Sequence, residues 1–251
     1  MARMPRLVVA GQAHLVIQRS LAARPGFVDD EDRHLYVQAM VTSARACSVA
    51  VHAYVLLENE ARLLVTPDAG NALGRFMQRL ARGYVPAFNG RHGKQGKLWA
   101  DRFQATVLDP DLFLLRAVRF IEQAPVKAGV VPAAEEWPWS SAAHHLGRCA
   151  NAAVSTHPAY WRLGNTPFER EARHGAELRK LLTDAQVAEI LNAARAGWPL
   201  GSTAFINALG QMTQRALQPR PCGRPRRIDS EIRSTKLTVS PFDPQSPIRD
   251  I

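Results

Sequence analysis

The sequence has few cysteines and lacks any long apolar run. Its three cysteines, Cys47, Cys149 and Cys222, lie far apart in a chain of 251 residues. This odd and scattered set predicts neither a disulfide framework nor a cysteine metal site. The longest apolar run, Val49–Leu57, is strand-sized, whereas a membrane helix needs about 18 apolar residues. The stretch Leu7–Ala10 is too short for a signal peptide, so we expect a cytoplasmic protein with no membrane partner.

Acidic residues are scarce relative to basic ones. The chain has 22 Asp and Glu against 32 Lys and Arg, which gives a formal net charge of +10 at pH 7. The excess is concentrated in residues 75–104 and 215–236, where most of the basic residues are arginines. Because a planar guanidinium suits phosphate, this distribution favours nucleic acid as the partner, with a merely solvated basic surface as the alternative.

Hydrophobic periodicity and helix-start signals predict an α+β fold. The predicted elements are a strand at 13–19, a helix at 29–46, strands at 49–57 and 61–66, a helix at 71–88, a strand at 103–108 and a helix at 109–123. This order is the ferredoxin-like split βαβ pattern with an added helix. We therefore expect an antiparallel sheet with helices on one face.

The composition changes after about residue 150, and we expect three regions. Residues 1–148 form the ferredoxin-like domain. Residues 149–217 form a C-terminal helical extension, in which Thr183 caps a helix at 185–194. Pro, Gly, Arg and Ser dominate residues 218–251, which predicts a disordered basic tail.

A set of short segments follows an order and spacing that resemble a known family. The segments are Met1–Arg6, Val51–Leu56, Leu63–Pro67, Gly96–Phe103, Pro125–Gly129, Trp137–Ser141, Gly197–Ser202 and Gly223–Arg227. Together they resemble the REP-associated tyrosine transposases, over nearly all of residues 1–227. These proteins are relatives of the single-strand insertion-sequence transposases, which use a tyrosine nucleophile and an HUH metal site.

The resemblance implies a ferredoxin-like domain that binds imperfect DNA hairpins. In active members a tyrosine attacks a DNA phosphate and forms a phosphotyrosine link. A divalent metal, held by the two histidines of a His-x-His strand and an amide side chain, polarises the scissile phosphate. Both parts are needed, because a phenol is a poor nucleophile near neutral pH and the charge developing on phosphate must be stabilised.

The sequence departs from the family at each position that carries this chemistry. The His-x-His stretch falls on Glu60-Ala61-Arg62, the tyrosine on Phe120 and the amide on Ala124. Arg62 has no lone pair to donate, and we expect it to form a same-face ion pair with Glu60. Phe120 has no hydroxyl and cannot form the phosphate ester. We therefore expect strand cleavage by this route to be lost and no cofactor to be needed, with Mg²⁺ or Mn²⁺ required only if activity is retained.

The helix that carries Phe120 is predicted to present an apolar face. Phe113, Ala117, Phe120 and Ala124 share that face by their i, i+4, i+7 and i+11 spacing. In place of a nucleophile and a metal ligand, this face offers a packing surface.

A substitute nucleophile would keep the chain an active transposase or nickase, so whether it is an enzyme stays open. The candidate is Tyr84, acting with a metal bound by Glu60. Tyr84 continues an apolar stripe, which favours a place in the core. The stripe consists of Leu73, Phe76, Met77 and Leu80.

Adjacent histidines do not replace the metal ligands. His144 and His145 are not expected to face one metal on a regular helix.

The elements expected to bind DNA match the family pattern better than the catalytic positions do. The helix at 71–88 carries arginines at i, i+4 and i+7, opposite its apolar stripe, and the loop after it combines basic residues with glycines. Trp99 either stacks on an unpaired base or closes the core. The segment 223–227 resembles an AT-hook, with an unstructured charged tail as the alternative. The expected DNA contacts are Arg75, Arg79, Arg82, Arg91, Lys94, Lys97, Trp99, Arg102, Arg224, Arg226 and Arg227.

Our reading of the sequence is a transposase-family protein with a degenerate active site. It is expected to bind the hairpin or single-stranded DNA of repetitive elements. A regulator that binds RNA hairpins and a poorly folded relic are the alternatives.

Overall fold

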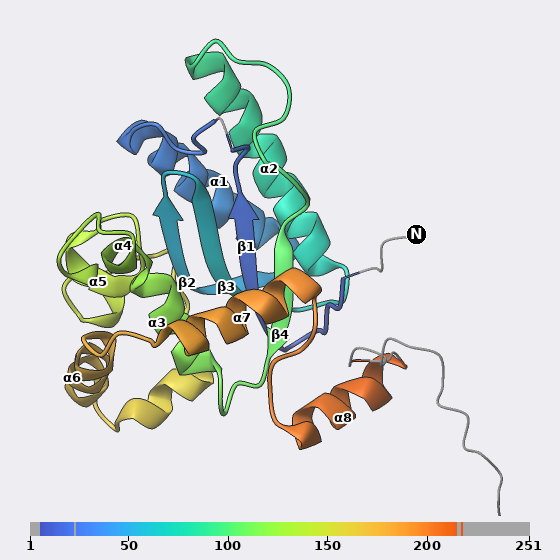
Figure 1. Ribbon diagram of the computed structural model, residues 1–251, viewed down its shortest axis with the longest axis vertical. Coiled ribbons are helices and arrows are strands. Elements are labelled where there is room, and N and C mark those ends of the chain that lie inside the picture. The colour runs from blue at the N-terminus through green and yellow to red at the C-terminus, as the bar shows by residue number, and fades with distance from the viewer. Residues whose placement is uncertain (1–5, 23, 215–216, 218–251) are drawn as a thin grey trace, which may run out of the picture. The chain divides into compact units, whose positions relative to one another are not determined.

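A four-stranded sheet forms the centre of the computed structural model, which describes residues 6–22, 24–214 and 217. Its strand order is β2-β3-β1-β4, and every neighbouring pair is antiparallel (Figure 1). The order along the chain and across the sheet is the ferredoxin-like arrangement that the sequence predicts. The strands are β1 (Ala13–Arg19), β2 (Val49–Leu57), β3 (Glu60–Pro67) and β4 (Gln104–Leu108).

Two helices, α1 (Asp30–Cys47) and α2 (Ala72–Arg91), cover one face of the sheet. The side chain of Asp29 caps α1 by accepting a hydrogen bond from the backbone N–H of Asp32 (2.9 Å). The apolar residues of α2 point toward the sheet and join α1 and the strands in one core. These two helices lie where the split βαβ pattern predicts them.

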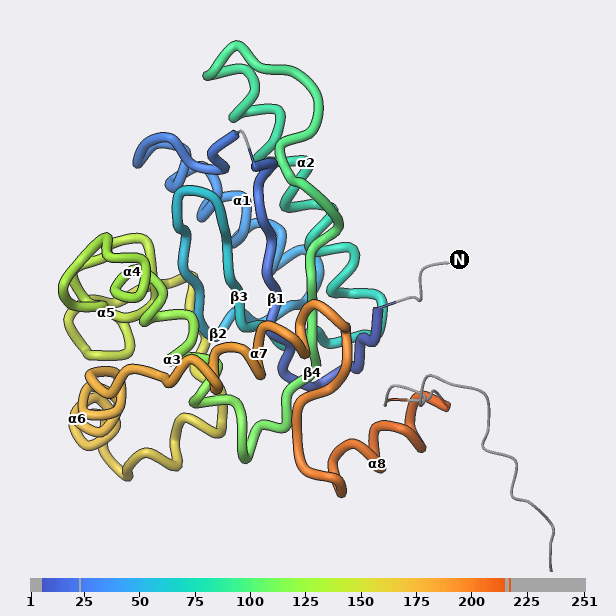
Figure 2. Tube along the Cα trace, viewed as in Figure 1, coloured from blue at the N-terminus to red at the C-terminus, as the bar shows by residue number. Residues whose placement is uncertain are grey.

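The opposite face of the sheet is also covered, by α3 (Leu114–Glu122) and α7 (Asp184–Ala196) (Figures 1 and 2). The expectation of helices on one face is therefore correct only for α1 and α2. The physical reason is that both faces of the central strands are apolar, and each face needs a cover. The other helices of the described chain are α4 (Ala124–Lys127), α5 (Ala142–His145), α6 (Pro167–Leu178), α8 (Thr203–Thr213) and the short 3₁₀ turns Ala134–Glu136 and Pro158–Leu163.

Segments from the second half of the chain cover both edges of the sheet. At the β2 edge, the N–H of Leu56 donates to the carbonyl of Trp139 (2.9 Å). At the β4 edge, the N–H of Leu200 donates to the carbonyl of Val107 (2.9 Å). The described residues accordingly form one compact unit, in which the expected extension packs on the sheet. The predicted division at residue 148 stays a prediction, and the tail from residue 218 lies outside the described residues.

Two helix boundaries differ from the predicted ones. α2 continues to Arg91, and its last turn is tied to the start of α1 by an ion pair with Asp29 (2.9 Å). The helix expected from Asp109 begins at Leu114, because the Asp109 carboxylate holds a turn by accepting the N–H of Asp111 (3.1 Å). None of the described helices is long and apolar enough to cross a membrane.

Candidate functional site

The residues at the positions where the family resemblance expects the catalytic groups meet between β3 and α3. Glu60 and Arg62 lie on the face of β3 that turns toward α3, and they form the predicted ion pair. The guanidinium of Arg62 lies 4.2 Å from the centroid of the Phe120 ring, and its Nη1 donates to the Phe120 carbonyl (3.0 Å). The structure therefore brings together positions that the sequence separates by nearly 60 residues.

Arg19 also belongs to this group, and the sequence analysis did not single it out. It pairs directly across the β1–β3 ladder with Glu60, and its Nε lies 2.5 Å from Glu60 Oε2. Each oxygen of Glu60 thus faces one arginine, and the trio carries a formal charge of +1. The signal that would have found Arg19 is the strand register, which a single sequence does not provide.

A pocket of about 230 Å³ opens beside Arg62 and Phe120. Its walls are mainly apolar, with Ala124 and Leu182 among them, and Lys127 adds a second cation. The metal that the family resemblance implies does not fit these residues. Arg62 would repel a cation, Phe120 and Ala124 offer no ligand atom, and both Glu60 oxygens already bind arginines.

The α3 face that was predicted to be apolar is a packing surface. Ala117, Phe120 and Ala124 are buried, and Phe113 packs on the same cluster. This cluster also contains Leu15 and other apolar residues of β1 and β2. The prediction for this helix face is confirmed.

Tyr84 lies in the core, where its hydroxyl donates to the carbonyl of Gly26 (2.6 Å). Its ring packs at 5.1 Å from that of Tyr36 and at 5.5 Å from that of Phe27. Burial raises the pKa of the Tyr84 phenol well above its usual value, and the nearby carboxylate of Asp32 raises it further. In this arrangement the hydroxyl can neither reach a DNA phosphate nor ionise easily.

Trp99 is a core residue and is not available to stack on a base. Its side chain closes the same aromatic cluster, 6.0 Å from Tyr84 and 6.1 Å from Phe27 between ring centroids. The ring leaves too little surface for a nucleobase, so of the two sequence-based readings the core reading is correct. The position is fixed by the bridge between Trp99 and Ser20 at the end of β1.

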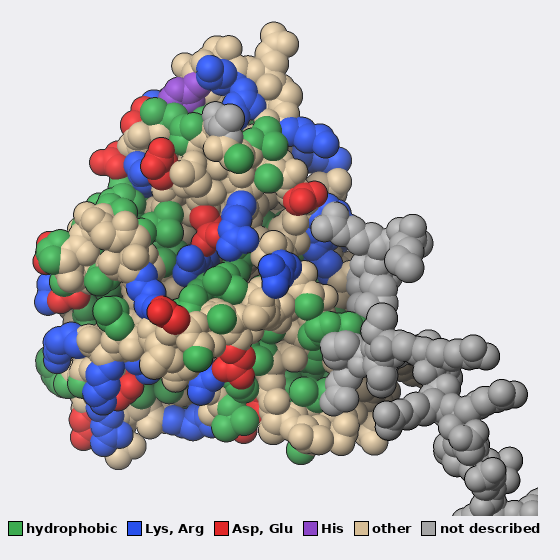
Figure 3. Space-filling model, viewed as in Figure 1, with side chains coloured by type: hydrophobic (Ala, Val, Ile, Leu, Met, Phe, Trp, Pro, Cys, Tyr) green, Lys and Arg blue, Asp and Glu red, His purple; other side chains and the backbone are tan. Residues whose placement is uncertain are grey.

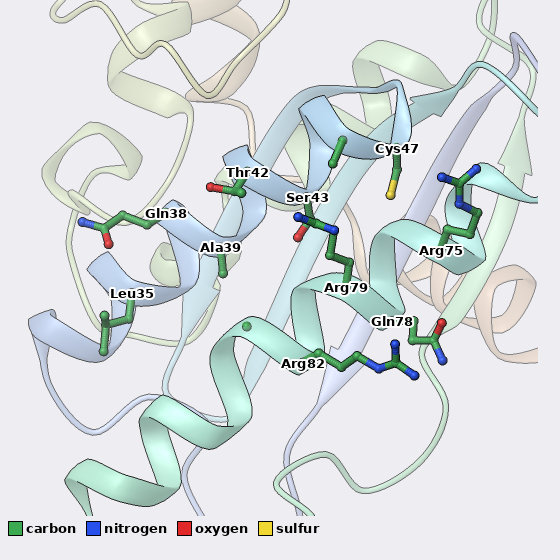
Figure 4. Close-up of a pocket in the computed structure, with 12 residues that line it drawn as sticks. Leu35, Gln38, Ala39, Thr42, Ser43, Cys47, Arg75, Gln78, Arg79 and Arg82 are labelled. Carbon is green, nitrogen blue, oxygen red and sulfur yellow. The ribbon is translucent and has the colours of Figure 1, made fainter.

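The predicted row of arginines on α2 is exposed. Arg75, Arg79 and Arg82 lie on successive turns along a groove between α1 and α2 (Figure 4). The groove has a volume of about 620 Å³, and its lining contains no acidic residue. Its polar wall on the α1 side includes Gln38 and Thr42. A basic groove of this kind fits a phosphate backbone.

The loop after α2 is only partly as expected. Arg91 belongs to the helix, and its guanidinium is held by Asp29 and Asp32. It is therefore not free to contact DNA, which differs from the expectation from the sequence. Lys94, Lys97 and Arg102 are exposed. The expected tail contacts, Arg224, Arg226 and Arg227, lie outside the described residues.

The two basic surfaces lie on opposite sides of the sheet. The α2 groove belongs to the layer of α1 and α2, whereas the trio of Arg19, Glu60 and Arg62 is on the side of α3 and α7. Figure 3 views the α7 side, where Lys and Arg side chains gather in the middle of the face. A DNA segment that contacts both the α2 groove and the trio of Arg19, Glu60 and Arg62 must therefore pass around an edge of the sheet.

Comparison with known proteins identifies this fold. No protein-family model matches the sequence, and no curated protein matches it. Among solved structures, the chain is similar to a REP-associated tyrosine transposase bound to a REP hairpin, with a TM-score of 0.52 and 16% identity, covering 63% of this chain and 93% of that one. The two chains share a fold. A structure from Deinococcus radiodurans R1, itself only provisionally assigned as a transposase, matches with a TM-score of 0.30 and 16% identity over 51% of this chain and 92% of that one, which is too distant to carry an argument.

Proposed function

We propose that this chain is a transposase-like DNA-binding protein that has lost the tyrosine route of strand cleavage. It binds the hairpin or single-stranded DNA of repetitive elements. The shared fold with a transposase that was solved with a REP hairpin supports the partner. The observation that carries the loss of chemistry is the contact between Arg62 and Phe120, at the positions where the family resemblance expects a metal ligand and the nucleophile.

The chemistry of these side chains supports binding without cleavage. A covalent phosphotyrosine link needs a hydroxyl, which Phe120 lacks, and the buried Tyr84 does not replace it. The positive charge beside this position comes from Arg62 and Arg19 in place of a metal. A phosphate is attracted to such a site, but no group there activates an attack on it. DNA binding is accordingly expected without an added divalent cation.

The α2 groove supplies the main backbone contacts. Its three arginines extend over about 10 Å of helix and leave one row of guanidinium groups facing solvent. Each phosphate contact that is removed lowers the salt dependence of binding by about one unit of slope. Removing the three charges together therefore changes both the affinity and its response to salt.

The test is hairpin binding by a triple variant, R75Q/R79Q/R82Q. We expect a loss of affinity of at least about tenfold and a salt slope smaller by about 3, measured by fluorescence anisotropy between 50 and 200 mM salt, conditions over which phosphate contacts have large effects. The matched control, R148Q/R173Q/R195Q, removes the same charge from exposed positions elsewhere.

The outcomes of this test separate the proposed function from its alternatives. Equal losses in the two triple variants would mean that the groove is only part of a solvated basic surface. Tighter binding of an RNA hairpin than of the DNA hairpin of the same sequence would favour the RNA-binding alternative, because only RNA carries a 2′-hydroxyl.

A further inference from the structure

Glu122, the last residue of α3, has a fully buried carboxylate that the proposed DNA-binding site does not use. Its Oε1 lies 2.6 Å from Nδ1 of His145, and its Oε2 lies 2.7 Å from Nε2 of His174. The hydroxyl of Ser141 donates to Oε1 as well (2.6 Å). Two histidines from separate helices, α5 and α6, thus point one ring nitrogen each at the same carboxylate.

The buried carboxylate needs a positive partner. Transfer of an unpaired carboxylate from water to the protein interior is costly. In the part of the chain that the structure describes, the groups that bond to Glu122 are Ser141, His145 and His174, and no lysine or arginine forms an ion pair with it. The two histidines are themselves buried, with 6% and 2% of their surfaces exposed. A protonated histidine would supply this charge, and so would a metal cation held among the three side chains.

The three side chains form a donor set that suits zinc. Two imidazole nitrogens and one carboxylate are a common set for this ion, which binds them at about 2.0–2.2 Å. The three ligand atoms lie within 4.8 Å of one another. Tetrahedral ligand atoms at those bond lengths lie about 3.3 Å apart, so the two oxygen–nitrogen pairs, now at 2.6 and 2.7 Å, would each open by about 0.6 Å on coordination.

We propose that Glu122, His145 and His174 form a buried structural site for a divalent metal ion of the zinc class. The Ser141 hydroxyl, which donates to Oε1 of Glu122, orients that carboxylate. The metal would join α3, α5 and α6, which Figures 1 and 2 show gathered on one side of the sheet. Because the ligands come from segments far apart in the sequence, metal binding would be coupled to folding.

The described chain has a second group of potential metal ligands, which differs from the group around Glu122. Asp29, Asp32 and His92 also bring their ligand atoms within 4.8 Å of one another. The guanidinium of Arg91 already bonds to both carboxylates, and Asp29 is exposed. This group has a permanent cation in Arg91, whereas the described basic partners of Glu122 are histidines alone.

The test is metal binding by the full chain, with zinc itself as the probe. The protein is stripped with a chelator, reloaded with one equivalent of Zn²⁺ and freed of unbound ion. We expect about one zinc per chain by mass spectrometry, and a higher midpoint of thermal unfolding for the loaded protein. X-ray absorption should show nitrogen and oxygen ligands without sulfur, which separates this site from one built on the cysteines.

Variants locate the site. H174Q should weaken zinc binding by at least about tenfold, whereas H34Q, which changes an exposed histidine outside the group, should bind like the unchanged chain. If H174Q does not fold, the absorption spectrum of the unchanged chain still decides the ligand set. No retained zinc, sulfur ligation or unchanged binding by a folded H174Q would overturn the proposal. None of these readouts depends on DNA, so the proposed function can fail or succeed separately.

Discussion

The guanidinium of Arg62 lies over the Phe120 ring, and the Glu60 carboxylate lies between Arg62 and Arg19. At the scale of single residues, these contacts put a guanidinium and a phenyl ring at the positions where the family resemblance expects a metal ligand and the nucleophile. A guanidinium attracts phosphate and repels metal, and a phenyl ring has no proton to lose. Under the proposed function, these two side chains allow DNA to bind at this place without cleavage.

Tyr84→Phe tests the role of the buried tyrosine. Removal of its hydroxyl leaves the buried carbonyl of Gly26 without that donor, so we expect a loss of about 1–2 kcal/mol in the free energy of unfolding, measured by urea denaturation. DNA affinity of the folded variant should not change. Unchanged stability together with lost action on DNA would show instead that the hydroxyl reaches the nucleic acid.

At the scale of elements, the helices that cover the sheet depend on local capping as well as on packing. α7 begins at a capping box, in which Thr183 accepts the N–H of Gln186 and the Gln186 side chain accepts the N–H of Thr183. This start holds α7 in register over the sheet, where Ile190 and Ala194 are buried.

Thr183→Ala removes half of this box. We expect it to cost about 1 kcal/mol of stability and to increase hydrogen exchange in the first turn of α7. Asn192→Ala, near the other end of the same helix, serves as the control because Asn192 makes no cap. If the two variants exchange alike, the cap does not fix this end of α7.

Local patterns made α2 and its arginine row predictable, because apolar periodicity and charge spacing are both properties of a short segment. The same holds for the apolar face of α3 and for the Thr183 cap. The pairing of Arg19 with Glu60 depends on strand register, and the burial of Trp99 depends on contacts with residues far away in the sequence. His145 and His174 likewise come together only in the folded chain, and no local pattern pairs them.

At the scale of the whole molecule, two buried histidines make stability depend on pH. Burial lowers the pKa of His14 from 6.5 to about 4, although a hydrogen bond to the Gln12 carbonyl opposes this shift. Burial likewise lowers the pKa of His52 to about 4. Between these values the unfolded chain binds protons that the native chain does not, so stability falls as pH falls from 6.5 to 4.

The predicted loss is at most about 3 kcal/mol for each of these histidines at pH 4. It can be measured as the slope of the unfolding free energy against pH. His52→Gln should reduce this slope, whatever it does to stability at neutral pH. A stability that is constant over this interval, or that rises as the solution becomes more acidic, would contradict the burial of neutral histidines.

The most direct test of the central claim is to mix the purified chain with labelled single-stranded DNA hairpins from repeats of its own genome and Mg²⁺ or Mn²⁺. The sample is run on a native gel and on a denaturing gel. The account predicts a shifted band on the native gel, with uncut DNA and no protein–DNA adduct on the denaturing gel. A cut strand or an adduct that survives denaturation would contradict it, because neither Phe120 nor the buried Tyr84 is able to form that link.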